Sequence, residues 1–282
     1  MFDAHPSNSQ HMEETQHGSW QWYLEAAKHA TATGDFEQAK ASYLAALSLA
    51  EQETGWSHAA VSALHSLLNE CFVQESTQRA NLLLRLARIY WRLNEFKAFP
   101  LEEEALAIRE RLLGADHPET IRVVETMARG HSALISFTKA IPLWERVLIH
   151  LDGADRVNAP NQANATLAVL MSLGEAYEAV DDHTNAELVW HRVLDLTSQR
   201  AAELHWSPKL LRFGHRLEAL YGIGCACNHQ GHWREAEELL QRAVAEHRHC
   251  QNQYFSKHGG AYSFGRDDGL HALAMALRGQ ER

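Results

Sequence analysis

Apolar residues recur along most of this chain at the three- and four-residue spacing of amphipathic helices. The first two such stretches cover residues 19–33 and 36–52, and a Gly-Asp pair separates them, which predicts a helical hairpin. Within this hairpin Ala27 and Ala39 lie 12 positions apart, and Ala46 follows seven positions later. Small residues let two helix backbones approach closely, so these positions predict where the helices pack.

The same intervals recur four more times along the chain. From the small residue of the first helix to the alanine of the second, the interval is 12 positions in four units and 11 in the second unit. A small or β-branched residue follows seven positions after that alanine in all five units, so the two share one helix face. This agreement predicts five helical hairpins. They cover about residues 19–52, 77–113, 118–151, 162–202 and 209–249.

One interval between units is long enough to hold an additional helix. Ala27 and Ala87, which occupy equivalent positions in the first two units, are 60 positions apart. Residues 56–73 fill part of this interval and show helical periodicity. Their apolar positions are Ala60, Val61, Leu64, Leu67, Leu68 and Phe72.

The two ends of the chain lack the repeated intervals, which run from residue 19 to residue 250. We expect residues 1–18 to be a disordered leader, because they contain no apolar core and no Lys or Arg. Residues 251–266 carry glycine and aromatic residues and are expected to be irregular. Residues 267–282 are expected to hold a last helix, begun by Asp267 or Asp268, that covers the end of the repeat array.

The stretch from Ala105 to Thr120, ALAIRERLLGADHPET, resembles the junction between tetratricopeptide repeats of the kinesin-light-chain type. The resemblance implies an all-α fold. Its architecture would be a right-handed superhelical α-solenoid of about five tetratricopeptide hairpins, with one extra helix and a C-terminal capping helix. Several positions depart from the family pattern: Glu102 and His183 stand where an aromatic residue is usual, and His131 and Cys227 where tyrosine is common. The resemblance further implies a scaffold that binds a partner segment in a concave groove lined by the first helices.

Arginine clusters on the predicted groove face of the second unit. Arg85, Arg88 and Arg92 are spaced i, i+3 and i+7, and Trp91 lies beside them. The other candidate groove residues are Arg122, Arg129, Met171, Glu175 and Tyr221. Five arginines in one region form a candidate receptor for carboxylates, because guanidinium groups bind them with two hydrogen bonds. The competing interpretation is a solvated face on which these arginines pair with nearby glutamates.

Charge and cysteine content narrow the class of partner. The formal net charge of −10 argues against general affinity for nucleic acid or anionic membranes. No run approaches the roughly 20 apolar residues needed to cross a bilayer. Four cysteines without a regular pattern indicate reduced thiols, typical of a cytoplasmic protein. We therefore expect a protein or peptide partner, which the arginines would make acidic, and no nucleic acid or membrane.

Cysteine and histidine gather between Cys225 and His232. Residues spaced i, i+2 on a helix point about 200° apart, so Cys225 and Cys227 cannot readily share one ion. We expect packed thiols and surface histidines here, with no metal and no cofactor. No catalytic motif is recognisable, which predicts a protein that is not an enzyme.

Three other hypotheses remain open. A self-associating scaffold, in the simplest case a homodimer, could use the Trp-rich ends of the chain or the additional helix over residues 56–73. A metal-binding protein or enzyme centred on Cys225 to His232 is a more distant alternative. The 19 histidines could also sense pH, since imidazole titrates near neutrality.

Overall fold

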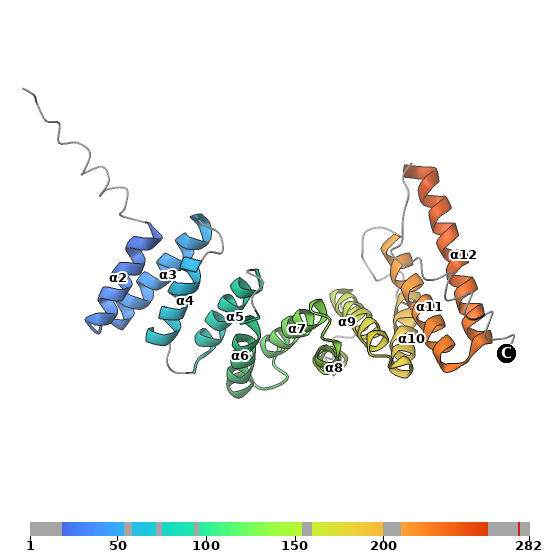
Figure 1. Ribbon diagram of the computed structural model, residues 1–282, viewed down its shortest axis with the longest axis horizontal. Helices are drawn as coiled ribbons and strands as arrows, with labels where there is room; N and C mark the ends of the chain where they lie inside the picture. Colours follow the sequence, from blue (N-terminus) through green and yellow to red (C-terminus); the bar gives the residue numbers. More distant parts are fainter. Residues whose placement is uncertain are drawn as a thin grey trace, which may run out of the picture. The chain divides into compact units, whose positions relative to one another are not determined.

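The computed structural model describes residues 19–53, 58–71, 75–92, 96–153, 160–199 and 210–258, together with Ala276. Within these ranges every regular element is a helix (Figure 1). The chain divides into two compact units, Met1–Val123 and Val124–Arg282. The predicted leader, residues 259–266 and, apart from Ala276, the predicted last helix lie outside the described residues.

The first unit contains two predicted hairpins and the predicted extra helix. Its helices are α2 (Trp20–Ala32), α3 (Phe36–Glu53), α4 (His58–Ser66), the π-helix η1 (Leu67–Cys71), α5 (Thr77–Arg92) and α6 (Ala98–Leu113). Helices α2 and α3 pack against each other, as do α5 and α6, and α4 with η1 contacts α3 and α5 (Figure 1). Helix α7 (Pro118–Ala133) begins in this unit and continues into the second.

The second unit contains the other predicted hairpins. Its remaining helices are α8 (Phe137–Gly153), α9 (Pro160–Ala179), α10 (His183–Gln199), α11 (Leu210–Gln230) and α12 (Trp233–His258). From α8 onward, each helix packs against the next one in the chain. Helix α12 corrects one expectation, because residues 251–258 continue it instead of being irregular. No glycine or proline interrupts α12 before Gly259 and Gly260, so nothing in the sequence ends the helix at Cys250.

One turn geometry joins the two helices of four hairpins. In each, the residue before the second helix donates its N–H to the carbonyl five positions back in the chain. The residue directly before this donor has a positive φ. The donor and acceptor pairs are Asp35 and Ala30 at 2.9 Å, Ser136 and His131 at 2.8 Å, Asp182 and Tyr177 at 2.9 Å, and His232 and Cys227 at 2.8 Å. The positive φ angles belong to Gly34, Ile135, Asp181 and Gly231. This shared turn, a Schellman motif, explains the constant 12-residue interval.

The small residues that define the intervals are buried where paired helices meet. Ala27, Ala39, Ala128, Ala140, Ala186 and Ala236 are each 0% exposed. Glycine replaces alanine where a larger side chain enters the interface. A Cβ atom on Gly174 of α9 would lie 2.5 Å from Trp190, and one on Gly222 of α11 would lie 2.2 Å from it. Trp190 of α10 therefore occupies the space that both glycines leave open.

A hydrogen bond donated by an indole N–H links the two helices of three hairpins. Trp144 donates to the Ser132 hydroxyl at 3.0 Å, and Trp190 donates to the Glu178 carboxylate at 2.8 Å. In both hairpins the tryptophan is on the second helix. The second hairpin exchanges the two positions, since Trp91 of its first helix donates to Glu102 of its second at 2.9 Å. This exchange accounts for the unusual glutamate at position 102.

Burial of the Glu102 carboxylate at this position is electrostatically unfavourable. Its side chain is 1% exposed, and its second carboxylate oxygen has no hydrogen-bond partner among the described residues. Burial raises the pKa of the Glu102 carboxyl to about 7, and the hydrogen bond from Trp91 opposes part of that rise. The charged form of Glu102 is therefore unfavourable in the folded protein.

The extra helix is anchored within the first unit. Its residues Leu64, Leu67 and Leu68 are buried in the core of that unit. The His65 ring and the Tyr90 hydroxyl lie 2.9 Å apart, and Arg79 of α5 donates to the Leu68 carbonyl at 3.1 Å. The predicted continuous helix thus begins as an α-helix and ends as a π-helix whose backbone is bound by α5.

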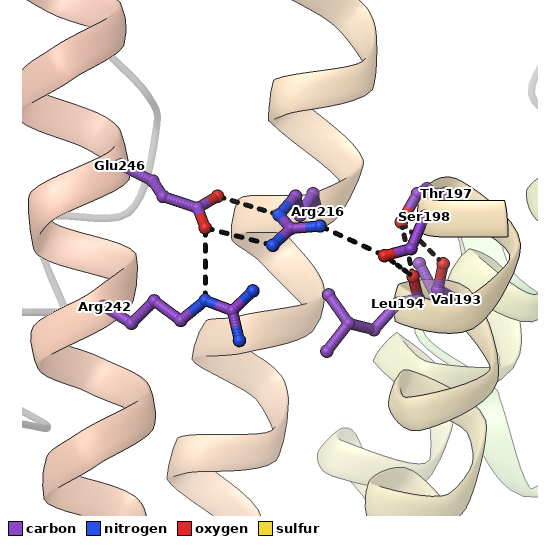
Figure 2. A network of polar contacts seen from close by, with 7 residues as sticks. All are labelled: Val193, Leu194, Thr197, Ser198, Arg216, Arg242 and Glu246. Atoms are coloured by element: carbon purple, nitrogen blue, oxygen red, sulfur yellow. Dashed lines mark hydrogen bonds and ion pairs between the residues drawn. The ribbon is translucent and has the colours of Figure 1, made fainter. Parts of the chain in front are cut away.

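Arginine and tyrosine side chains link successive hairpins in the second unit. Figure 2 shows Arg216 of α11, which binds Glu246 of α12 at 2.9 Å and donates to the Ser198 hydroxyl of α10 at 3.1 Å. The Tyr177 hydroxyl of α9 donates to Glu145 of α8 at 2.5 Å. The bonds to Ser198 and Glu145 join neighbouring helices of different hairpins, whereas the bond to Glu246 lies within the fifth hairpin.

The contact between Gly174 and Trp190 predicts that alanine is tolerated less well at Gly174 than at Gly153, which has no such contact. Gly174→Ala should lower the free energy of unfolding by about 1–3 kcal/mol, because the added methyl group collides with the indole. Gly153→Ala is the matched control, because a Cβ there meets no atom within 4 Å, and it should be neutral or stabilising. Urea denaturation measures both. Equal stability of the two variants would contradict this account of the interface.

The buried carboxyl predicts a pH-dependent gain from Glu102→Gln. Because the pKa of Glu102 is higher in the folded than in the unfolded state, the wild type loses stability as pH rises from 4.5 to about 7. Glutamine retains an oxygen for Trp91 and does not ionise. The stability of the variant relative to wild type should therefore increase by up to about 3 kcal/mol across this window. Urea denaturation at several pH values measures the change, and Glu103→Gln, at an exposed neighbour, should show no such increase.

Candidate functional site

Helix α5 presents three arginines opposite its buried face. Leu83, Leu86 and Ala87 are buried in the core of the first unit. Arg88 and Arg92 are exposed and Arg85 is half-buried, and their i, i+3 and i+7 spacing on one continuous helix places them on one face. The helix thus combines a packed side with a cationic one.

Trp91 is tied to its own hairpin. Besides its bond to Glu102, its ring meets Phe99 edge to face, with ring centroids 4.9 Å apart. The side chain is half-buried and packs against the core of the first unit. Only part of the indole can therefore contact a partner, and its N–H is already used.

The other two candidate arginines lie on α7. Arg122 and Arg129 are both exposed, and Arg129 forms an ion pair with Glu125 one helical turn away. Arg122 belongs to the first unit and Arg129 to the second. We call the surface of α5 that carries Arg85, Arg88 and Arg92 the arginine face.

Arg109 was not among the predicted site residues. It is a buried side chain of α6 that joins α5 to α7. It is 8% exposed, and it donates to the Asn81 side chain of α5 at 2.6 Å and to the Glu119 carbonyl of α7 at 2.5 Å. Burial lowers the pKa of the Arg109 guanidinium, Glu119 opposes this, and the positive charge of Arg122 adds to it. The available signal was its place four residues after Ala105, on the buried side of α6.

Two of the predicted groove residues in the second unit offer little surface. Met171 is 8% exposed and Tyr221 is 7% exposed, so both are mainly core residues. Helical periodicity allowed either orientation, and packing against neighbouring helices buries them. Glu175 of α9 is exposed. Of the three predicted groove residues in this unit, only Glu175 is therefore exposed to a partner.

The thiols and histidines of the second unit form a separate polar region. Cys225 is half-buried and Cys227 is buried, and both are free thiols, as is Cys71. Burial raises the pKa of the Cys227 thiol to about 12, and the carboxylates of Glu187 and Glu235 add to the rise. The rings of His183 and His229 are stacked with centroids 4.0 Å apart.

No helix in the described part of the chain has the length and apolar character required to span a bilayer.

Comparison with curated proteins finds no match. Among solved structures, BtubC (BKLC) from P. vanneervenii is 17% identical and aligns over 88% of this chain and 97% of its own, with a TM-score of 0.50. Kinesin light chain TPR-like repeats from Podosopora anserina are 19% identical over 84% of this chain and 96% of theirs, with a TM-score of 0.45.

Family models described as tetratricopeptide repeat match three separate parts of the chain. They cover residues 23–53, 79–119 and 219–253. These ranges correspond to α2 with α3, α5 with α6, and α11 with α12. Together with the repeated hairpins and their common turn, these matches identify the fold. The chain therefore contains tetratricopeptide repeats in these three segments.

Proposed function

We propose that this protein is a non-catalytic interaction scaffold that binds an acidic segment of a partner protein on the arginine face. Tetratricopeptide repeats serve in general as protein–protein interaction scaffolds, with the first helices lining the binding surface. The observation that carries the proposal is the exposure of Arg88 and Arg92 on a first helix whose opposite side is fully packed.

The chemistry of guanidinium groups favours a carboxylate ligand. Each arginine can donate two parallel hydrogen bonds to a carboxylate, and the spacing on α5 presents several such donors along one line. A single exposed ion pair contributes only about 0–1 kcal/mol, so binding requires several to act together. The net charge of −10 would repel an acidic partner at long range. Affinity must therefore arise from short-range contacts with this face.

Ion pairs within the chain support the competing interpretation of a solvated face. Arg79 binds Glu104 at 2.7 Å, and Arg111 pairs with Glu75. Both ion pairs lie at the surface of the first unit and join residues of that unit. The proposal requires Arg88 and Arg92, which are exposed, to bind carboxylates of a second molecule as well.

Self-association is the second candidate function, and burial of the extra helix restricts it. The leucines that could have formed a dimer surface are in the core of the first unit. The exposed Trp22 near the start of the described chain is the remaining candidate at that end. Size-exclusion chromatography with light scattering separates the two functions, since the proposed receptor is monomeric and the alternative is a dimer. The free thiols favour a cytoplasmic location for either.

Charge reversal on α5 tests the proposal. The double variant Arg88→Glu, Arg92→Glu should capture a specific acidic partner at least about tenfold less than wild type does. The substitutions replace attraction by repulsion at two positions one helical turn apart. The measurement is affinity capture from cells of the source organism at moderate salt, with quantitative mass spectrometry. Capture by the wild type should also weaken as salt increases.

The matched control reverses two exposed charges on second helices, in a variant with Lys139→Glu and Arg248→Glu. It changes the net charge by the same amount and should retain the partner. If the α5 variant and the control capture the same proteins in the same amounts, the arginine face is not the binding site.

A further inference from the structure

Three residues with metal-binding side chains come together at the turn between α11 and α12. The Cys227 sulfur, a ring nitrogen of His232 and a carboxylate oxygen of Glu235 all lie within 4.8 Å of one another. Among the residues that the structure describes, this is the one group of three or more Cys, His, Asp or Glu with such geometry. It belongs to the second unit, whereas the arginine face belongs to the first, and it has no role in the proposed peptide binding.

The backbone of the turn brings these side chains together. The His232 N–H donates to the Cys227 carbonyl at 2.8 Å, the Gly231 N–H donates to the Asn228 carbonyl at 3.2 Å, and Gly231 has a φ of 82°. In such a Schellman motif the side chains at the two ends of the longer bond are neighbours. Glu235 lies in the first turn of α12, three positions after His232, where a side chain can reach back to the helix start.

The equivalent turns of three other hairpins provide an internal comparison. The position of His232 is occupied there by Asp35, Ser136 and Asp182, and the position of Glu235 by Gln38, Lys139 and Asn185. Asp35 and Asp182 act as helix caps, accepting hydrogen bonds from the N–H groups of Gln38 and Asn185 at 3.1 and 3.2 Å. Histidine is not a preferred capping residue. Capping therefore does not account for His232, and only the fifth hairpin combines a thiol, an imidazole and a carboxylate.

We infer that Cys227, His232 and Glu235 form a zinc-binding site at the α11–α12 turn. Sulfur, imidazole nitrogen and carboxylate oxygen are the ligands that Zn²⁺ takes in tetrahedral sites, whereas Mg²⁺ and Ca²⁺ prefer oxygen alone. Bonds of 2.0–2.3 Å place tetrahedral ligands about 3.5 Å apart, so ligand atoms that lie within 4.8 Å of one another need to close by at most about 1.3 Å. His232 and Glu235 are exposed and can adjust their rotamers toward the buried sulfur.

The surroundings of the site are suited to a cation. Glu187 of the neighbouring helix α10 acts electrostatically on Cys227, and its carboxylate is held by Gln230 at 2.7 Å. It adds a second negative charge to that of Glu235. On binding, the Cys227 thiol gives its proton to solvent and its thiolate coordinates the ion. Three protein ligands leave the fourth position to water.

Cobalt substitution tests the site directly. Protein prepared without a His tag should bind one Co²⁺ per chain and show the near-ultraviolet charge-transfer absorption of a cobalt thiolate, and Zn²⁺ should displace the cobalt. Cys227→Ser should abolish this absorption. His232→Gln and Glu235→Gln should each weaken Zn²⁺ binding, measured by calorimetry, at least about tenfold, since loss of even an outer-shell partner costs 10–100-fold.

Matched substitutions of nearby residues separate this site from adventitious binding by the many histidines. Cys225→Ser, His229→Gln and Glu238→Gln change the same residue types close by and should leave the absorption and the affinity unchanged. Absence of the cobalt thiolate absorption in the wild type would overturn the inference. Its loss in Cys225→Ser, or unchanged affinity in both His232→Gln and Glu235→Gln, would do the same. The last two variants are at exposed positions, so they decide the matter if Cys227→Ser fails to fold.

Discussion

Close contact between paired helices at small side chains is the constraint on which each hairpin depends. The alanines at the interfaces are fully buried, and Gly174 and Gly222 appear where the indole of Trp190 needs the space. Interfaces packed this tightly tolerate few changes in volume. The opposite helix faces are free of this constraint. The arginines of α5 and the Cys227, His232 and Glu235 cluster lie outside these tight contacts, on an exposed face and at a turn.

Much of the fold could be predicted from sequence because its determinants are local. The 12-residue interval reflects one turn with one hydrogen-bonding pattern, and the seven-residue interval reflects two turns of helix. The features that escaped prediction depend on contacts between distant residues. The π-helical end of α4 is stabilised by Arg79, which follows it in sequence by several residues, and Glu102 is accommodated only because Trp91 faces it.

The candidate sites show where reasoning from helical spacing reaches its limit. It placed Arg85, Arg88 and Arg92 together because all three lie on one helix. It also argued that Cys225 and Cys227 diverge, so it kept a metal site between Cys225 and His232 only as a distant alternative and did not include Glu235. A turn with positive φ reverses the chain and brings Cys227 to His232, which no helical projection represents. Burial of Met171, Tyr221 and Arg109 likewise depends on neighbouring helices.

The exchanged positions of Trp91 and Glu102 have a consequence for how such proteins can be recombined. The second hairpin carries indole then carboxylate, whereas the fourth, with Glu178 and Trp190, carries carboxylate then indole. A chimera that joined the first helix of one to the second helix of the other would bury two indoles or two carboxylates at a single position. Whole hairpins can be shuffled or duplicated without this conflict. The hairpin, and not the single helix, is therefore the smallest segment that can be exchanged while keeping these indole–carboxylate bonds.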